Sequence, residues 1–198
     1  VERPASSSGK PPVVLIHGTG AWSEIWRGTM HNLARAGYRA IALDMPPFGY
    51  TVPPANADYG DEAQARRILG AVDSLHLSKV IFVGHSFGGR PTMQATFIAP
   101  ERVEALVLVD AALGLQAKPA EGSRLLKATL GMTSLRNALV ASTFTNPLLT
   151  RRLFSMLVAE KTAVTTSRVV MLQQPFVVEG ATPRLGEWLL PFATTSEA

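Results

Sequence analysis

The sequence predicts an α/β fold with a mostly parallel sheet, and two observations carry that prediction. Short apolar runs alternate with segments of helical periodicity through residues 13–112. Continuous apolar runs bounded by turn residues are typical of strands buried on both faces, as in parallel sheets. After residue 114 no strong strand pattern occurs, and helix-like segments follow one another. The first region therefore indicates parallel strands joined by helices, and the second a helical subdomain.

Each predicted element has its own pattern in the sequence. The predicted strands are 13–16 (VVLI), 38–43 (YRAIAL), 79–83 (KVIFV) and 103–109 (VEALVLV). Between them, helices are predicted over 22–36, 61–75 and 87–98. In the second of these helices, Ala65, Ile68 and Val72 belong to one apolar stripe. After residue 114 the predicted helices are 121–131, 134–143, 147–159, 161–173 and 183–190, while 176–178 (FVV) is ambiguous between helix and strand.

Composition excludes several classes of protein. The chain has 198 residues, 46% of them hydrophobic and 17% charged, which is ample for a hydrophobic core. It has no cysteine, which excludes a disulfide scaffold, a zinc ribbon and an iron–sulfur protein. No apolar run is long enough for a transmembrane helix, and the start at Val1 has no signal-peptide pattern. The cellular location cannot be inferred from the sequence, and the cytoplasm is only a default.

The net charge of +4 lies wholly in the second region. Residues 1–114 hold 10 basic and 10 acidic residues, whereas residues 115–198 hold 9 basic and 5 acidic ones, so 9 − 5 gives +4. The basic residues are scattered among Leu, Met, Val and Thr, and only Arg151 and Arg152 are adjacent. This pattern favours a solvated helical surface over a nucleic-acid interface.

One motif carries nucleophilic chemistry. Gly84-His85-Ser86-Phe87-Gly88 has the form G-x-S-x-G, with a strand before it and a helix after it. In that context the motif is a nucleophile elbow, in which the serine lies on a strained turn and the glycines leave room for the neighbouring strand and helix. We therefore predict that Ser86 is a nucleophile, which needs a base to accept its proton.

A second motif supports the first. His17-Gly18-Thr19-Gly20 follows the first buried strand. We predict that the backbone N–H groups of Thr19 and Phe87 form an oxyanion hole, although an ordinary strand–helix turn remains the alternative for the first motif. No phosphate-binding loop, metal-ligand cluster or dinucleotide fingerprint is found in the sequence, so no cofactor and no metal are predicted.

The sequence resembles the α/β-hydrolase fold family, in its serine-nucleophile branch with a helical cap. The matching segments are VVLIHGTGAWSEIW, GYRAIALDMPPFGY, KVIFVGHSFGG and APERVEALVLVDAA, which cover residues 13–112. The resemblance implies an α/β-hydrolase core over 1–114 and a cap or lid over 115–198. It also implies that His17, Gly18 and His85 shape the pocket around the nucleophile.

The sequence departs from the family pattern in its histidines. The family orders its triad as Ser, then Asp or Glu, then His. All four histidines of this chain precede Ser86: His17, His31, His76 and His85. We expect His31 and His76 on helix surfaces. Asp110, after the last predicted strand, is the candidate acid, beside the alternative of a structural aspartate that hydrogen-bonds a loop.

Truncation is the simplest interpretation of these departures. We expect the catalytic histidine, and with it the usual acid and the final strands, to lie beyond residue 198. Val1-Glu2-Arg3 resembles the end of a strand whose hairpin partner is missing, so we expect a cut at that end too. Without the histidine the fragment is expected to be inactive or nearly so.

The predicted function is a serine hydrolase, esterase-like or lipase-like when complete. Carboxylic-ester hydrolysis through an acyl-enzyme on Ser86 is the leading prediction. The sequence does not distinguish it from lactone, carbon–carbon, peroxidase-like or amide chemistry. The expected partner is a small hydrophobic substrate, with no nucleic acid and no membrane span, and the oligomeric state is open. The alternative is a non-catalytic relative that binds a small hydrophobic ligand or a protein partner.

Overall fold

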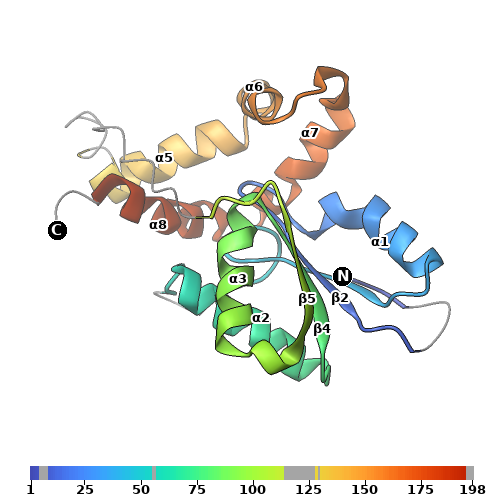
Figure 1. Cartoon of the computed structure of the whole chain (residues 1–198). Coiled ribbons are helices and arrows are strands. Elements are labelled where there is room, and N and C mark those ends of the chain that lie inside the picture. Colours follow the sequence, from blue (N-terminus) through green and yellow to red (C-terminus); the bar gives the residue numbers. More distant parts are fainter. Residues whose placement is uncertain (5–8, 55–56, 114–127, 129, 195–198) are drawn as a thin grey trace. The chain divides into compact units, whose positions relative to one another are not determined.

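The computed structural model describes residues 1–4, 9–54, 57–113, 128 and 130–194. The chain divides into two compact units, Val1–Leu115 and Gln116–Ala198. The first unit holds the sheet and its flanking helices, and the described part of the second is helical (Figure 1). The assignment of the second unit as a cap stays a prediction.

The sheet of the first unit has five strands in the order β1-β3-β2-β4-β5. They are β1 (Glu2–Arg3), β2 (Val13–Ile16), β3 (Ala40–Leu43), β4 (Val80–His85) and β5 (Val103–Val109). Strands β2 to β5 pair in parallel, and β1 pairs antiparallel with β3. The α/β fold with a mostly parallel sheet is therefore confirmed.

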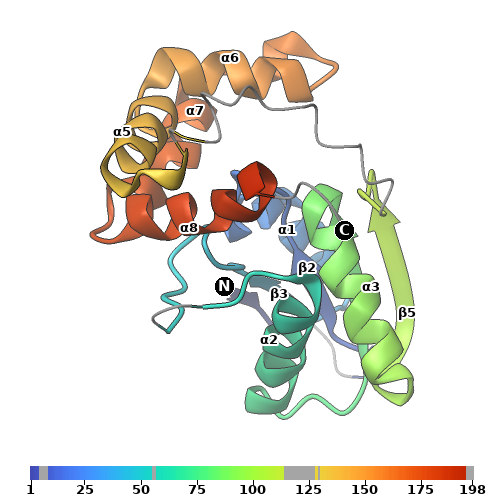
Figure 2. The ribbon, with the colours of Figure 1, turned by 90° about the vertical axis from the view of Figure 1, so that its left-hand side faces the viewer.

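Helices cover both faces of this sheet. In chain order they are η1 (Ser23–Trp26), α1 (Arg27–Arg35), α2 (Asp61–Ser74), η2 (Ser86–Gly88), α3 (Gly89–Ile98) and η3 (Pro100–Arg102). Helices α2 and α3 lie on one face and α1 on the other (Figure 2). Strand β2 shows why its apolar run is continuous: Val14 and Ile16 pack into the core on the α2 side, and Val13 and Leu15 into the core on the α1 side.

The second unit follows the predicted helical pattern. Its fully described elements are α5 (Thr133–Phe144), α6 (Pro147–Leu157), η4 (Lys161–Ala163), α7 (Thr166–Gln173), η5 (Gln174–Val177) and α8 (Ala181–Thr194). The predicted helix 121–131 falls largely outside the described residues. The ambiguous segment 176–178 is not a strand, because its first two residues belong to η5. Among the described helices, none combines the length and apolar character that crossing a bilayer requires.

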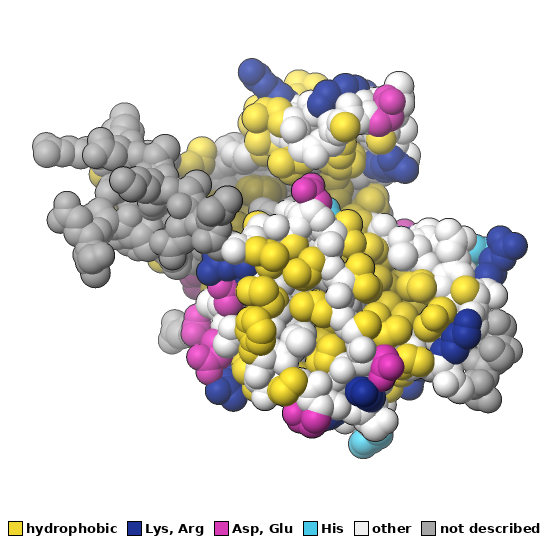
Figure 3. Space-filling view, in the orientation of Figure 1, with side chains coloured by type: hydrophobic (Ala, Val, Ile, Leu, Met, Phe, Trp, Pro, Cys, Tyr) yellow, Lys and Arg dark blue, Asp and Glu magenta, His cyan; other side chains and the backbone are white. Residues whose placement is uncertain are grey.

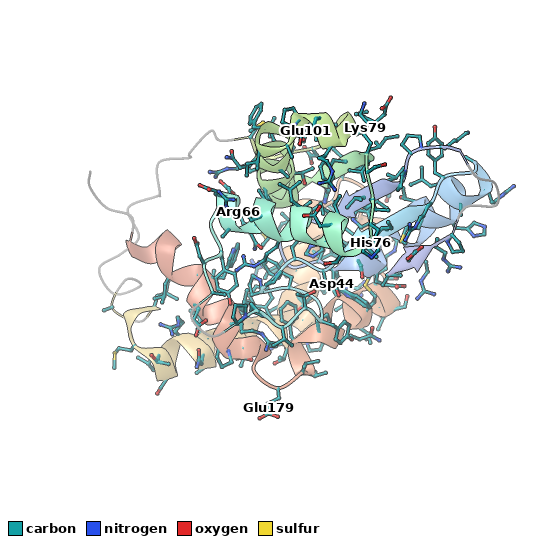
Figure 4. All side chains as sticks on the ribbon, turned by 90° about the horizontal axis from the view of Figure 1, so that it is seen from below. Asp44, Arg66, His76, Lys79, Glu101 and Glu179 are labelled. Atoms are coloured by element: carbon teal, nitrogen blue, oxygen red, sulfur yellow. The ribbon has the colours of Figure 1, made fainter. Side chains whose placement is uncertain are left out.

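The end of α2 corrects the expected place of His76. His76 lies beyond the helix, with a left-handed φ of +54°. The Leu77 N–H donates to the Val72 carbonyl at 3.0 Å, and the His76 N–H donates to the Asp73 carbonyl at 2.9 Å. These two bonds form a Schellman motif, which places a residue of positive φ directly after the helix. Figure 4 labels His76 at this end of the helix.

We predict that His76→Gly raises the free energy of unfolding by about 0.5–1 kcal/mol, because glycine adopts positive φ without the Cβ clash of other residues. Urea unfolding followed by circular dichroism measures this. Gly37, which ends α1 with a φ of +86°, is the matched control, and Gly37→Ala should destabilise the protein. Equal or lower stability of His76→Gly would contradict the assignment.

Strand β5 forms one edge of the sheet among the described residues. Val107 and Val109 on this strand are 44% and 41% exposed, and Phe97 on α3 is 68% exposed. Figure 3 shows hydrophobic side chains gathered on this face of the first unit. A long apolar edge strand offers unpaired backbone groups to another strand and is prone to self-association.

We predict that Val107→Lys reduces self-association of the chain, because charged side chains on an edge strand oppose strand pairing. Sedimentation velocity over a concentration series measures the fraction of oligomer. Val52→Lys, at a valine that is 69% exposed outside the sheet, is the matched control and should leave association unchanged. An equal effect of both variants would show that the added charge, and not the β5 edge, is responsible.

Candidate active site

Ser86 lies on a sharp turn between a buried strand and a helix. Strand β4 ends at His85, and η2 and α3 follow directly. Ser86 has a φ of +52°, in the left-handed region that costs an L-residue about 1–2 kcal/mol. Among the described non-glycine residues, only His76 and Asp110 share such a φ. This strained strand–turn–helix geometry is the one that projects a nucleophilic side chain from the end of a sheet.

The glycines of the elbow are needed for close packing. A Cβ atom at Gly84 would lie 2.9 Å from both the Gly89 Cα and the Thr92 Oγ1, so strand and helix meet there. A Cβ atom at Gly88 would collide with the carbonyl oxygen of His17. The predicted reason for these glycines, contact with the neighbouring helix and strand, is what the structure shows.

The end of β2 lies directly beside Ser86. A Cβ atom at Gly18 would lie 2.8 Å from the Ser86 Cβ, 3.3 Å from the Ser86 Oγ and 3.1 Å from the His85 Nδ1. The structure therefore brings Gly18 beside His85 and Ser86, which lie far from it in the sequence. Thr19, the next residue, is exposed, and Phe87 is half-buried. The roles of their N–H groups as oxyanion donors stay a prediction.

His17 fixes the path of the chain at this turn. Its Nε2 accepts a hydrogen bond from the Met45 N–H at 2.9 Å. Because that nitrogen is an acceptor, Nδ1 carries the proton and donates to the Gly18 carbonyl at 2.9 Å. Burial disfavours the charged imidazolium and lowers the pKa of His17 below its ordinary value of 6.5. His17 is thus a neutral brace between the Gly18 turn and the loop after β3.

Asp44 is a positioning residue that the sequence reasoning missed. Its carboxylate accepts hydrogen bonds from the Ser23 N–H at 2.7 Å and the Tyr50 N–H at 3.0 Å. Gly49, with a φ of +68°, has no room for a Cβ atom because the Asp44 side chain fills that space. Asp44, labelled in Figure 4, thereby ties the end of β3 to the start of η1 and to the following loop through these two hydrogen bonds. Its sequence signal is an aspartate at a strand end before a Pro-Pro-Phe-Gly turn.

The candidate acid lies at the end of β5, on a turn that contacts the elbow. Asp110 is exposed and has a φ of +46°. Two residues later, the Ala112 N–H donates to the Ser86 carbonyl at 3.0 Å. Among the described residues, the Ser86 Oγ has no hydrogen bond to an imidazole or a carboxylate. The catalytic role of Asp110 stays a prediction.

Comparison with known families decides the classification. The family model described as "alpha/beta hydrolase fold" matches residues 11–161. The chain belongs to the α/β-hydrolase fold family. This confirms the resemblance found in the sequence.

Similar proteins of this family are hydrolases. The chain is 42% identical to 2-hydroxy-6-oxo-2,4-heptadienoate hydrolase of Pseudomonas putida over 104 residues, 50% of this chain and 37% of that protein. It is 30% identical to 2-hydroxy-6-oxononadienedioate/2-hydroxy-6-oxononatrienedioate hydrolase of Cupriavidus pinatubonensis over 167 residues, 77% of this chain and 58% of that protein. The chain therefore spans between about a third and three fifths of these relatives.

Solved structures give the same fold. The epoxide hydrolase CorEH superposes with a TM-score of 0.78 at 19% identity, over 98% of this chain and 69% of that one. A meta-cleavage product hydrolase from Pseudomonas fluorescens superposes with a TM-score of 0.71 at 25% identity, over 98% of this chain and 68% of that one. The arrangement of strands and helices is thus shared with enzymes of different named activities, so the fold alone does not select a substrate.

We predict that His17 makes folding stability depend on pH. Because the folded-state pKa is lowered, the unfolded chain binds the proton more tightly than the folded chain does. The stabilising contribution of neutral His17 is therefore complete above pH 6.5 and is lost as the pH falls below 6.5 toward the folded-state pKa. In His17→Gln this part of the pH dependence should vanish, and overall stability should fall by about 1–3 kcal/mol because buried hydrogen bonds are lost.

Urea unfolding at a series of pH values measures this dependence. His31→Gln replaces an exposed imidazole on α1 and serves as the matched control, which should keep the slope of the unmodified protein. A His17→Gln variant that loses stability with acid as steeply as the unmodified protein would show that another group titrates.

Proposed function

We propose that Ser86 is the nucleophile of a hydrolase that attacks a carbonyl carbon, with a carboxylic ester as the substrate class. The observation that carries this proposal is the strained backbone of Ser86 with the Gly18 turn beside its Oγ. A hydroxyl projected from a strand–helix elbow, next to backbone that can donate hydrogen bonds, suits acyl transfer.

The proposed reaction has two stages, acylation of Ser86 and hydrolysis of the acyl-enzyme. The Ser86 Oγ attacks the carbonyl carbon while a base accepts the hydroxyl proton, and the carbonyl oxygen becomes an oxyanion. The N–H groups of Thr19 and Phe87 donate to that oxyanion, each worth about 2.7–4 kcal/mol in such sites. The alcohol leaves with the proton, and water then releases the carboxylic acid and restores the hydroxyl.

The base is the part that the described residues do not supply. His17 is neutral with both ring nitrogens engaged, so it serves as a brace and not as the base. We propose Asp110 as the acid of the site, because its turn is joined to Ser86 through the Ala112 N–H. Without an imidazole hydrogen-bonded to the Ser86 Oγ among the described residues, we expect turnover several orders of magnitude below that of a serine hydrolase with an intact triad.

The exposed apolar side chains of the helical unit support the proposal of a hydrophobic substrate. Helix α6 has no buried residue, and it exposes Leu148, Met156 and Leu157 by 76%, 71% and 77%. An apolar surface of this kind is suited to contact with an apolar ligand.

Two other functions each have an observation in their favour. Carbon–carbon hydrolysis is favoured by the relatives, which are named as hydrolases of 2-hydroxy-6-oxo acids. A non-catalytic role in binding a hydrophobic ligand or a protein is favoured by the exposed apolar side chains of helix α6. Turnover of a carboxylic ester, hydrolytic carbon–carbon cleavage of such an oxo acid, and ligand binding without turnover are the three outcomes that distinguish these functions.

We predict that butylboronic acid forms a tetrahedral adduct on Ser86, because a boronate mimics the oxyanion intermediate. Boron-11 NMR detects the tetrahedral species, and Ser86→Ala should abolish it. Hydrolysis of p-nitrophenyl butanoate, weak in this chain, should fall at least tenfold further in the same variant. Ser78→Ala, at an exposed serine, controls for the loss of a hydroxyl. Equal adduct and turnover in Ser86→Ala would contradict the nucleophile assignment.

A further inference from the structure

Three buried polar atoms beside the elbow have no hydrogen-bond partner among the described residues. They are the Ser23 Oγ, the Trp26 Nε1 and the His85 Nδ1. Ser23 is 1% exposed and Trp26 is 8% exposed. Buried polar atoms are paired in the great majority of cases, so three orphans in one region point to a group that completes them.

The fold places the three residues at one end of the sheet. Ser23 and Trp26 are the first and last residues of η1, and residues three apart eclipse each other on a 3₁₀ helix. His85 follows Ile81 and Val83 at alternate positions of β4, and those two residues pack on the same core cluster as Trp26. The Trp26 and His85 rings meet edge to face, with centroids 6.2 Å apart at 88°.

This group of atoms, the η1 niche, borders the nucleophile. The position of a Cβ atom at Gly18 is 3.1 Å from the His85 Nδ1 and 3.3 Å from the Ser86 Oγ. The His85 side of the niche is therefore adjacent to a ligand carbonyl bound at Ser86.

The chemistry of the niche selects an uncharged acceptor. The indole N–H of Trp26 only donates, so its partner must accept, which excludes a cation. Ser23 and His85 can each donate or accept. An anion is disfavoured because the Asp44 carboxylate already accepts from the Ser23 N–H at 2.7 Å. A neutral oxygen can accept from the Trp26 N–H and from one of the other two groups, and a water or hydroxyl oxygen can in addition donate to the third.

We propose that the η1 niche binds one uncharged oxygen: a water molecule in the free protein and an ether, carbonyl or hydroxyl oxygen of the substrate in the complex. The part of this proposal that concerns a substrate oxygen, the substrate half, rests on the proposed function of Ser86. The part that concerns water in the free protein, the water half, does not. The niche would select substrates that carry an oxygen at a fixed distance from the attacked carbonyl.

The water half is tested by NMR on the free protein. A cross-relaxation peak between the Trp26 Hε1 and a long-lived water is expected, and it should vanish in Trp26→Phe. The indole of Trp188, in the other unit, is the matched control, because Trp188→Phe should leave the Trp26 peak in place. The absence of any cross-relaxation between the Trp26 Hε1 and water would overturn the water half of the proposal.

The substrate half is tested with octan-2-one and its ether analogues, in which one CH2 group at a time, from C4 to C7, is replaced by oxygen so that the ketone is kept. One analogue should bind about tenfold more tightly than octan-2-one, the value of one good hydrogen bond. Trp26→Phe should erase the preference, and Trp188→Phe should keep it. Ser23→Ala should weaken it and keeps the test decisive where Trp26→Phe fails to fold.

The outcomes separate the niche from the proposed function. Equal affinities of all the ketones, with the boronate adduct still formed on Ser86, would overturn the substrate half of the niche and leave the nucleophile in place. A position-dependent ether preference without any adduct would support the niche and overturn the function of Ser86.

Discussion

The close approach of three backbone segments at Ser86 is the constraint on which the rest of the first unit depends. The end of β2, the end of β4 and the start of α3 meet with glycines at the contact points, and Cβ atoms at Gly18, Gly84 or Gly88 would collide with their neighbours. Only this packing compensates for the positive φ of Ser86, because an isolated turn would relax out of the left-handed region. The glycines are thus as much a part of the site as the serine.

A second layer of hydrogen bonds keeps these segments in register. The neutral imidazole of His17 joins the Gly18 turn to Met45. The carboxylate of Asp44, the residue before Met45 in the same loop, accepts a hydrogen bond from the Ser23 N–H. Both side chains project from loops at the carboxyl ends of neighbouring parallel strands, where an α/β sheet commonly forms its binding crevice. The neutrality of His17 matters here, because an imidazolium would lose the acceptor that holds Met45.

The sequence predicted the strand–helix order and the elbow because each has a local signal. Strand β5 begins and ends at the predicted residues, since its apolar run is bounded by η3 and by Asp110. The motif at Ser86 was readable because glycines and serine occupy fixed positions in a short turn. Asp44 and Trp26 were not found, because their partners lie on other segments and no local pattern marks a long-range hydrogen bond or ring contact. His76 was misplaced because a Schellman end without glycine looks like helix in the sequence.

Ser23 connects the two layers. Its N–H is held by Asp44, whereas its Oγ belongs to the η1 niche, so the position of the niche depends on the same carboxylate that orders the loop around Gly49. The structure of the Gly18 turn and the structure of the η1 niche are therefore not independent. A change that loosens Asp44 would move η1, and with it Trp26 against His85, the residue that directly precedes Ser86. The selection of substrate by the η1 niche and the placement of Ser86 would in this way both depend on the Asp44 carboxylate.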